Sequence, residues 1–169
     1  MKQNFDENPL NVEGLIENSD IAIDPESGLA IVVIKPDAFR NRDRVHSILE
    51  RQGLHIERTV ERKLPIDFVL GQMYSDLPEG IKDATGEHFA SGESEIILVK
   101  GGPDLGEKIV QITGVDTDPA KCDKDTIRFL FGEHFSRPAG DKQYFRNAAH
   151  RGKNPWEVGD DLKKFEGFF

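Results

Sequence analysis

The sequence lacks the features that mark several large classes of protein. Its 169 residues include one cysteine, Cys122, so an intramolecular disulfide and a four-thiolate zinc site are both excluded. No apolar run approaches the roughly 20 residues of a membrane-spanning helix, and the first residues lack the apolar segment of a signal peptide. These absences predict a protein that works in the reducing cytoplasm and does not bind membranes.

Positive charge is also scarce. Lysine and arginine together number 22 against 31 aspartates and glutamates, which gives a net charge of −9. Nucleic acids and anionic membranes are held mainly by cationic side chains, so neither is expected as a partner. The GxxxxGK[ST], GxGxxG, HExxH and CxxC motifs are absent as well. The common nucleotide and zinc motifs therefore do not explain this chain, although a small basic pocket is compatible with its composition.

The acidic residues are concentrated at the N-terminal end. Residues 1–28 carry one lysine and seven acidic residues, a balance of −6, whereas the rest of the chain carries −3. We interpret residues 1–28 as an acidic N-terminal extension and residues 29–169 as one domain, because the chain is too short for two ordinary domains. The extension is either a solvated arm or a segment that docks on a neighbour through its apolar residues. Those residues are Leu10, Val12, Leu15 and Ile16.

Strand and helix patterns alternate after the acidic segment. The β-branched run at 29–34 predicts a strand buried on both faces, and apolar residues at helical spacing predict a helix that ends before Gly53. A second strand is expected at 54–60, and Pro65 opens a second helix. Residues 75–93 are rich in glycine and charge, so an irregular or short-helical excursion is expected there.

The second half of the chain continues the alternation. A strand is predicted at 96–99, followed by a helix that Asp104 caps and Gly114 ends. Residues 126–140 carry no assignable pattern, and residues 144–149 suit a short strand.

The last helix has three start signals in register, an N-cap asparagine, a proline at the first helical position and a glutamate three residues after the cap. These residues are Asn154, Pro155 and Glu157, and the apolar residues expected to face inward are Val158, Leu162 and Phe165. Strands alternating with helices predict an α/β or α+β sandwich, with helices packed against a sheet.

Polar side chains at the ends of the predicted elements are the candidates for chemistry, because sites gather on loops held by a scaffold. Lys35 ends the first strand, where it either extends to water or forms the floor of a phosphate pocket. Arg128 and Arg146 either pair with surface carboxylates or together form an anion site. His150 follows two alanines, and it is either a packed residue or a nucleophile. The other histidines, expected to be packed or on the surface, are His46, His55, His88 and His134.

The blocks IVVIKPDAFR, TDPAKCDKDTIRFLFG and RNAAH occur in this order along the chain. Together they resemble nucleoside diphosphate kinase. The first resembles the family's strand ending in Lys-Pro-Asp, the second its Thr-(Asn/Asp)-Pro-Ala turn followed by Thr-Ile-Arg, and the third its Arg-Asn-x-x-His strand. The resemblance covers residues 30–165. It implies an α/β (α+β sandwich) fold of the ferredoxin-like type, with a four-stranded antiparallel sheet covered by helices.

The resemblance also implies the chemistry. His150 would accept the γ-phosphate of a nucleoside triphosphate and pass it to a nucleoside diphosphate, with ping-pong kinetics. Lys35 and Arg128 would supply the positive charge that phosphoryl transfer requires. A neutral imidazole can act as the nucleophile without a separate base.

Three further residues have roles implied by the resemblance. Thr117 would contact phosphate through its hydroxyl, Asn147 would hydrogen-bond the sugar, and Tyr74 would help to place Lys35. Mg²⁺ is expected with the nucleotide, held by phosphate oxygens and water and not by a protein metal site. The implied partners are nucleoside di- and triphosphates and further copies of the chain, in a homo-oligomer of dimers that form a tetramer or a hexamer.

The chain departs from the family pattern around the nucleophile. In the family, a supporting serine is the second residue after the histidine. Here Arg151 and Gly152 follow His150, so this serine is missing. Asp161 stands where the family has a glutamate that accompanies this serine, and it is either a support for His150 or an ordinary exposed acid. The residues leave open whether Arg151 helps phosphate binding or blocks it.

Two further departures concern the nucleotide. The family's phosphate-binding arginine falls near residues 110–111, which leaves Lys108 as the nearby replacement. Its base-stacking aromatic residue falls near Ile81, where Tyr144 or Phe145 would compensate from the other side. Two functions therefore stay open, an active kinase of low base selectivity and a degenerate nucleotide-binding or oligomeric module with weak or no catalysis.

Overall fold

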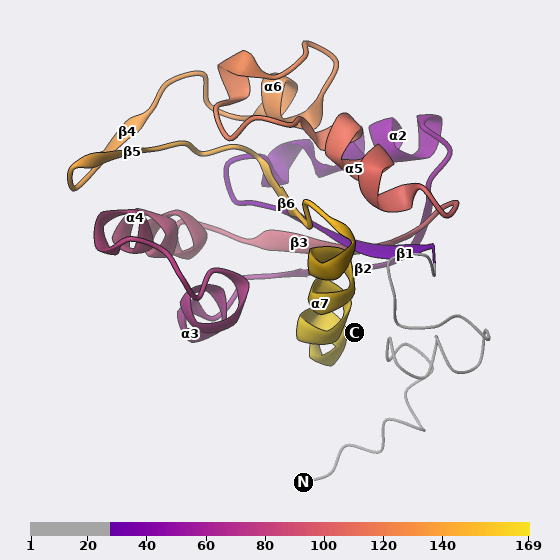
Figure 1. The fold of residues 1–169 in the computed structure, drawn as a ribbon, viewed down its shortest axis with the longest axis horizontal. Coiled ribbons are helices and arrows are strands. Elements are labelled where there is room, and N and C mark those ends of the chain that lie inside the picture. Colours follow the sequence, from indigo (N-terminus) through magenta and orange to yellow (C-terminus); the bar gives the residue numbers. More distant parts are fainter. Residues whose placement is uncertain (1–27) are drawn as a thin grey trace, which may run out of the picture.

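A computed structural model describes residues 28–169, and its centre is an antiparallel sheet in the order β2-β3-β1-β6 (Figure 1). The strands of this sheet are β1 (Leu29–Ile34), β2 (His55–Arg62), β3 (Ser94–Lys100) and β6 (Ala149–Arg151). A separate hairpin consists of β4 (Arg137–Ala139) and β5 (Lys142–Tyr144). The helices are α2 (Arg42–Arg51), α3 (Ile66–Phe68), α4 (Glu79–Ala90), α5 (Leu105–Thr113), α6 (Ile127–Phe131) and α7 (Pro155–Phe165). The predicted acidic extension, except Gly28, lies outside the described residues.

The central strand β1 separates two hydrophobic cores. All six of its residues are buried, which confirms the prediction of a strand covered on both faces. Because successive side chains of a strand point to opposite faces, Ala30, Val32 and Ile34 belong to one core. Leu29, Ile31 and Val33 belong to the other.

Helices cover both faces of the sheet, which confirms the predicted α+β sandwich. The first core includes buried residues of α2, α5 and α6, and the second includes buried residues of α4 and α7. Figure 1 shows α2, α5 and α6 on one side of the sheet and α3 and α7 on the other. Within the described part of the chain, no helix combines the length and the apolar character needed to cross a membrane.

Most predicted helix boundaries are confirmed. Gly53 follows α2 with a φ of 84°, and Gly114 ends α5 with a φ of 111°, a left-handed backbone that favours glycine. Asp104 stands at the N-cap of α5 as predicted, but its side chain accepts no capping hydrogen bond. At α7 the cap forms as predicted, because Asn154 Oδ1 accepts the N–H of Glu157 at 3.0 Å.

The excursion predicted at residues 75–93 is wrong, because α4 is a regular helix of twelve residues. It was not recognisable from an apolar stripe, since its buried residues are Thr85, His88 and Phe89. Gly80 in its first turn allows close packing on the hairpin, where a Cβ would overlap the carbonyl of Ala139.

The strand predicted at 144–149 is also wrong. Strand β5 ends at Tyr144 and β6 begins at Ala149. Between them Ala148 has a φ of 69°, the one positive value among the described non-glycine residues, and this conformation interrupts an extended strand.

Candidate active site

Six side chains with roles implied by the resemblance line a single cavity of about 520 Å³. They are Lys35, Tyr74, Thr117, Arg128, Asn147 and His150. Asp161 and Ile81 line it as well. The first six come from five separate stretches of the chain, and the fold brings these stretches together.

Pairing of β1 with β6 brings the first and third motifs into contact. His150 lies opposite Val33 in the antiparallel register. Just beyond the end of β1, the N–H of Lys35 donates to the carbonyl of Ala148 at 2.8 Å. The lysine of the first motif is therefore held beside the histidine of the third.

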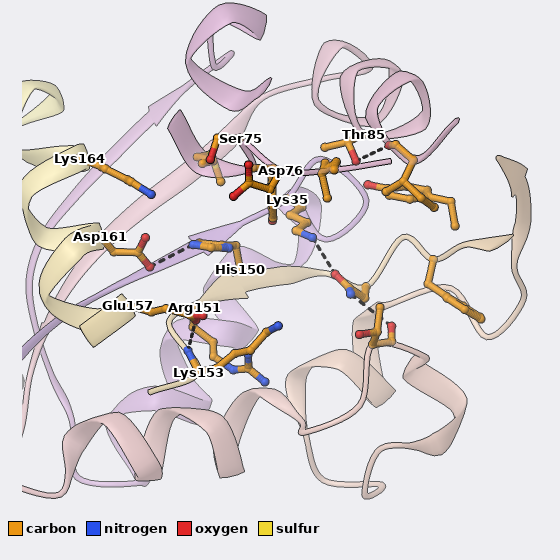
Figure 2. Close-up of a pocket in the computed structure, with 18 of the residues that line it drawn as sticks. Lys35, Ser75, Asp76, Thr85, His150, Arg151, Lys153, Glu157, Asp161 and Lys164 are labelled. Carbon is orange, nitrogen blue, oxygen red and sulfur yellow. Dashed lines mark hydrogen bonds and ion pairs between the residues drawn. The ribbon is translucent and has the colours of Figure 1, made fainter. Parts of the chain in front are cut away.

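The His150 ring is oriented by Asp161 (Figure 2). Its Nε2 lies 3.0 Å from Asp161 Oδ2, and Asp161, on α7, is only 4% exposed. An ionised carboxylate only accepts hydrogen bonds, so Nε2 carries the proton and the lone pair lies on Nδ1. The Tyr74 ring stands at 83° to the imidazole, with the two centroids 5.3 Å apart. Asp161 is thus buried and hydrogen-bonded to His150, and it is not an exposed acid.

Lys35 is a buried amine at the floor of the cavity. Its Nζ donates to Asn147 Oδ1 at 2.8 Å and lies 5.6 Å from the centre of the Tyr74 ring. Burial, aided by the charge of Arg128, lowers the pKa of Lys35 to about 7, although nearby Asp37 opposes the shift. The lysine is therefore poised to gain full charge when an anion arrives.

Two buried arginines flank the same cavity. Arg128 donates to the carbonyls of Asp116 and Ala149, at 2.9 and 3.3 Å, and burial lowers its pKa. Arg151 donates from Nε to Thr113 Oγ1 at 3.0 Å and from Nη2 to the Gly114 carbonyl at 2.8 Å. Burial and the charge of Arg128 lower the pKa of Arg151 to about 10.

None of these three basic side chains has a carboxylate as a hydrogen-bond partner among the described residues. Lys35, Arg128 and Arg151 are 6, 7 and 4% exposed. Within residues 28–169 all their hydrogen bonds go to amide, hydroxyl or carbonyl oxygens. Buried charges without ionic partners are costly, so this cavity is built for a ligand with several negative charges.

Apolar and aromatic side chains line the cavity together with the cations. Ile81 and Thr85 come from α4, and Tyr144 and Phe145 come from the end of the hairpin. The two residues predicted to replace the missing stacking residue therefore line the same cavity as Ile81. Trp156, the only tryptophan of the chain, lines it as well and is 73% exposed.

Two of the predicted supporting residues lie outside the cavity lining. Lys108 extends toward Gly53, where a Cβ would lie 3.6 Å from its Nζ. Arg146 is partly exposed, and its carbonyl accepts the N–H of Glu133 at 2.8 Å. The structure puts Arg151 in the cavity instead, on the same side as the end of α5.

Arg151 was difficult to place from the sequence, because neighbours in a strand point to opposite faces. His150 and Arg151 indeed face different layers, the first contacting Asp161 and the second Thr113. Strand β6 is an edge of the sheet, so side chains from both of its faces can reach one cavity.

Comparison with known proteins supports the fold. No protein-family model and no curated protein sequence matches this chain. The nucleoside diphosphate kinase of Aquifex aeolicus matches with a TM-score of 0.67 and 18% identity, over 81% of this chain and 93% of that one. An NDP kinase from Pyrobaculum aerophilum matches with a TM-score of 0.67 and 18% identity, over 82% and 94%.

A third solved structure carries ligands. The nucleoside-diphosphate kinase of Borrelia burgdorferi, a transition state mimic with bound vanadate and ADP, matches with a TM-score of 0.66 and 18% identity, over 81% of this chain and 85% of that one. The chain therefore has the fold of nucleoside diphosphate kinases, as its motifs predicted.

Proposed function

We propose that the protein is a nucleoside diphosphate kinase that transfers the γ-phosphate of a nucleoside triphosphate to a nucleoside diphosphate through phosphorylated His150. The observation that carries this proposal is one cavity holding three buried cations beside a histidine whose Nε2 is fixed by a buried carboxylate. A polyphosphate would supply the missing negative charge and bring a phosphoryl group next to a nucleophile.

The first half-reaction uses the lone pair of His150 Nδ1. This nitrogen attacks the γ-phosphorus, a nitrogen–phosphorus bond forms, and the bond to the bridging oxygen breaks, releasing the nucleoside diphosphate. Asp161 accepts the Nε2–H and stabilises the positive charge that develops on the ring. A second nucleoside diphosphate then attacks the phosphohistidine by the reverse of this step, which gives ping-pong kinetics.

The cations stabilise the charge on the transferred group. Phosphoryl transfer passes through a loose transition state, so the protein contributes mainly position and electrostatics. Lys35, Arg128 and Arg151 supply positive charge from three directions without reorganising, because each is already fixed by neutral hydrogen-bond partners. The Thr117 hydroxyl would add a phosphate contact, and the free N–H of Asn147 would reach the sugar, since its other amide groups bond Lys35 and the Thr117 carbonyl.

Mg²⁺ would enter with the nucleotide. In residues 28–169 no group of three or more His, Cys, Asp or Glu side chains is placed to hold a metal ion. The side chains proposed to face the phosphates are cationic, which fits an ion coordinated by phosphate oxygens and water and neutralising part of their charge. We further propose a dimer-based homo-oligomer in the cytoplasm, the latter supported by the single cysteine.

Steady-state exchange between ATP and a second nucleoside diphosphate tests the function. Double-reciprocal plots at several acceptor concentrations should give parallel lines, and His150→Ala should abolish turnover while leaving nucleotide binding measurable by Trp156 fluorescence. Nucleotide binding by the wild type without any exchange would overturn the kinase and support the alternative, a catalytically inactive nucleotide-binding module.

A further inference from the structure

A second histidine, His88, is buried beside the cavity and uses both ring nitrogens. It is 0% exposed and comes from α4. Its Nε2 lies 2.8 Å from Asp37 Oδ1, and its Nδ1 lies 2.9 Å from the Tyr144 hydroxyl. No step of the phosphoryl transfer proposed for His150 uses His88.

The hydrogen-bonding capacity of its partners fixes the state of His88. The Asp37 carboxylate accepts, so Nε2 carries the proton, and burial lowers the pKa of His88 and favours the neutral ring, against the effect of Asp37. Nδ1 must then accept the Tyr144 O–H. Lys35 and Arg146 also act on the ring, and both charges further oppose its protonation.

Asp37 connects this histidine to the segment that carries the nucleophile. Its second oxygen, Oδ2, accepts the N–H of Ala148 at 2.9 Å. Ala148 has a φ of 69°, a left-handed conformation that a non-glycine residue keeps only where its surroundings hold it. The turn at Ala148 sets the direction of Asn147 before it and of β6, with His150, after it.

We propose that His88 is a positioning residue for phosphoryl transfer: through Asp37 it holds the Ala148 turn that aims His150, and through Tyr144 it fixes the wall of the nucleotide cavity. This role rests on the proposed function. The two arms act on different parts of the reaction, because the Ala148 turn precedes the strand that carries His150 and Tyr144 lines the cavity wall. Loss of the first arm should lower kcat, and loss of the second should raise KM.

Three variants separate the arms from a general loss of stability. His88→Phe removes both hydrogen bonds of His88. Tyr144→Phe removes the second, together with the bond between the Tyr144 hydroxyl and Thr85, and leaves the first in place. His88→Gln supplies an amide N–H that can replace the donor to Asp37. His46→Phe is the matched control, because His46 Nε2 also lies 2.8 Å from a buried carboxylate, Glu95, but outside the cavity.

The exchange assay gives the first readout. His88→Phe should lower kcat by about tenfold to a hundredfold, and His88→Gln should recover it to within about threefold of the wild type. Tyr144→Phe should raise KM about threefold or more with kcat nearly unchanged, and His46→Phe should leave both constants unchanged. Equal losses in His88→Phe and His46→Phe, or no recovery in His88→Gln, would overturn the proposal.

Nitrogen-15 NMR of the histidine rings gives a second readout that needs no turnover. In the wild type, His150 and His88 should both carry a proton on Nε2, which faces the carboxylate in each case. In His88→Phe, or in His88→Leu if the first does not fold, His150 should become a mixture of tautomers. If the wild type exchanges no phosphate, the proposed function has failed, and an unchanged His150 tautomer in these variants separately refutes the positioning role.

Discussion

His88 and His150 make the same first contact and differ at the second ring nitrogen. Both present Nε2–H to a buried aspartate, Asp37 at 2.8 Å and Asp161 at 3.0 Å. In His88 the Nδ1 position accepts the Tyr144 hydroxyl, whereas in His150 no residue of the described chain bonds Nδ1. The His150 side chain is 14% exposed and opens on the cavity, and the His88 side chain is wholly enclosed. A carboxylate orients either ring, and only His150 presents an open Nδ1 to the cationic cavity, which is why the proposed function assigns the nucleophile to it.

The largest effect is expected from weakening the carboxylate that orients His150. Asp161→Asn should lower kcat about a hundredfold or more, because an amide also donates and no longer selects the Nε2–H tautomer. Asp161→Glu keeps a carboxylate and should retain most of the activity. Steady-state exchange rates measure both variants, and equal rates for wild type and Asp161→Asn would show that the ring needs no such orientation.

The next largest effect concerns the cationic side chains of the cavity that His150 faces. Arg151→Met should weaken nucleotide binding by about 2 kcal/mol, close to thirtyfold in Kd. The same change should raise the free energy of unfolding without ligand by about 1 kcal/mol, because it removes a buried charge that faces Arg128.

Trp156 fluorescence titration and urea unfolding measure these two effects. Lys108→Met is the control, since Lys108 lies outside the cavity lining, and it should change neither quantity. A variant that binds nucleotide as tightly as the wild type would remove Arg151 from the site.

A smaller effect is expected where α4 packs on the hairpin that carries Tyr144. Gly80→Ala places a methyl group against the Ala139 carbonyl, so the hairpin must shift and KM should rise about fivefold with kcat little changed. Gly86→Ala, in the same helix, meets only ordinary contacts with Leu70 and Ile66 and should leave KM unchanged. Equal KM values for the two variants would mean that this contact does not shape the cavity.

The smallest effect is a fraction of a proton taken up at Lys35. With a pKa of about 7, Lys35 is mostly neutral at pH 8 in the protein without nucleotide, and a bound polyphosphate restores its charge. Nucleotide binding at pH 8 should therefore take up most of one proton at this residue. Calorimetry in two buffers of different ionisation enthalpy measures the uptake, and Lys35→Met should lower it by that amount.

The same group links stability to pH. The pKa of Lys35 is about 7 in the folded protein against an ordinary value of 10.5, so between these values the unfolded chain binds more protons. The free energy of unfolding should then rise with pH across this window. Below pH 7 the full cost of burying the charged Lys35 lowers the stability of the folded protein. Urea unfolding at pH 7 and pH 9 should show a smaller rise for Lys35→Met than for the wild type.

Much of the fold was predictable because local signals agreed with burial. The uninterrupted β-branched run of β1 gave a strand covered on both faces, and Asn154, Pro155 and Glu157 gave the start of α7. Helix α4 was missed because it packs through Thr85, His88 and Phe89, which form no apolar stripe.

The residues of the candidate site that belong to the three sequence motifs were predictable. Lys35, Asn147 and His150 were found by resemblance, and the structure places them together. The role of Arg151 was left open and His88 was expected to be an ordinary packed or surface residue. The position of Arg151 depends on β6 being an edge strand, and that of His88 on contacts across 51 and 56 residues of sequence. No local pattern encodes either relation.

Intact-protein mass spectrometry after mixing with ATP and Mg²⁺ tests the central claim most directly. Neutral to alkaline conditions are required because phosphohistidine is acid-labile, and wild type, His150→Ala and His88→Gln should be compared. We predict one phosphate adduct on the wild type and on His88→Gln, removed by adding GDP, and none on His150→Ala. An adduct that persists in His150→Ala, or a wild type that binds ATP and gains no phosphate, would contradict the assignment of His150 as the phosphate carrier.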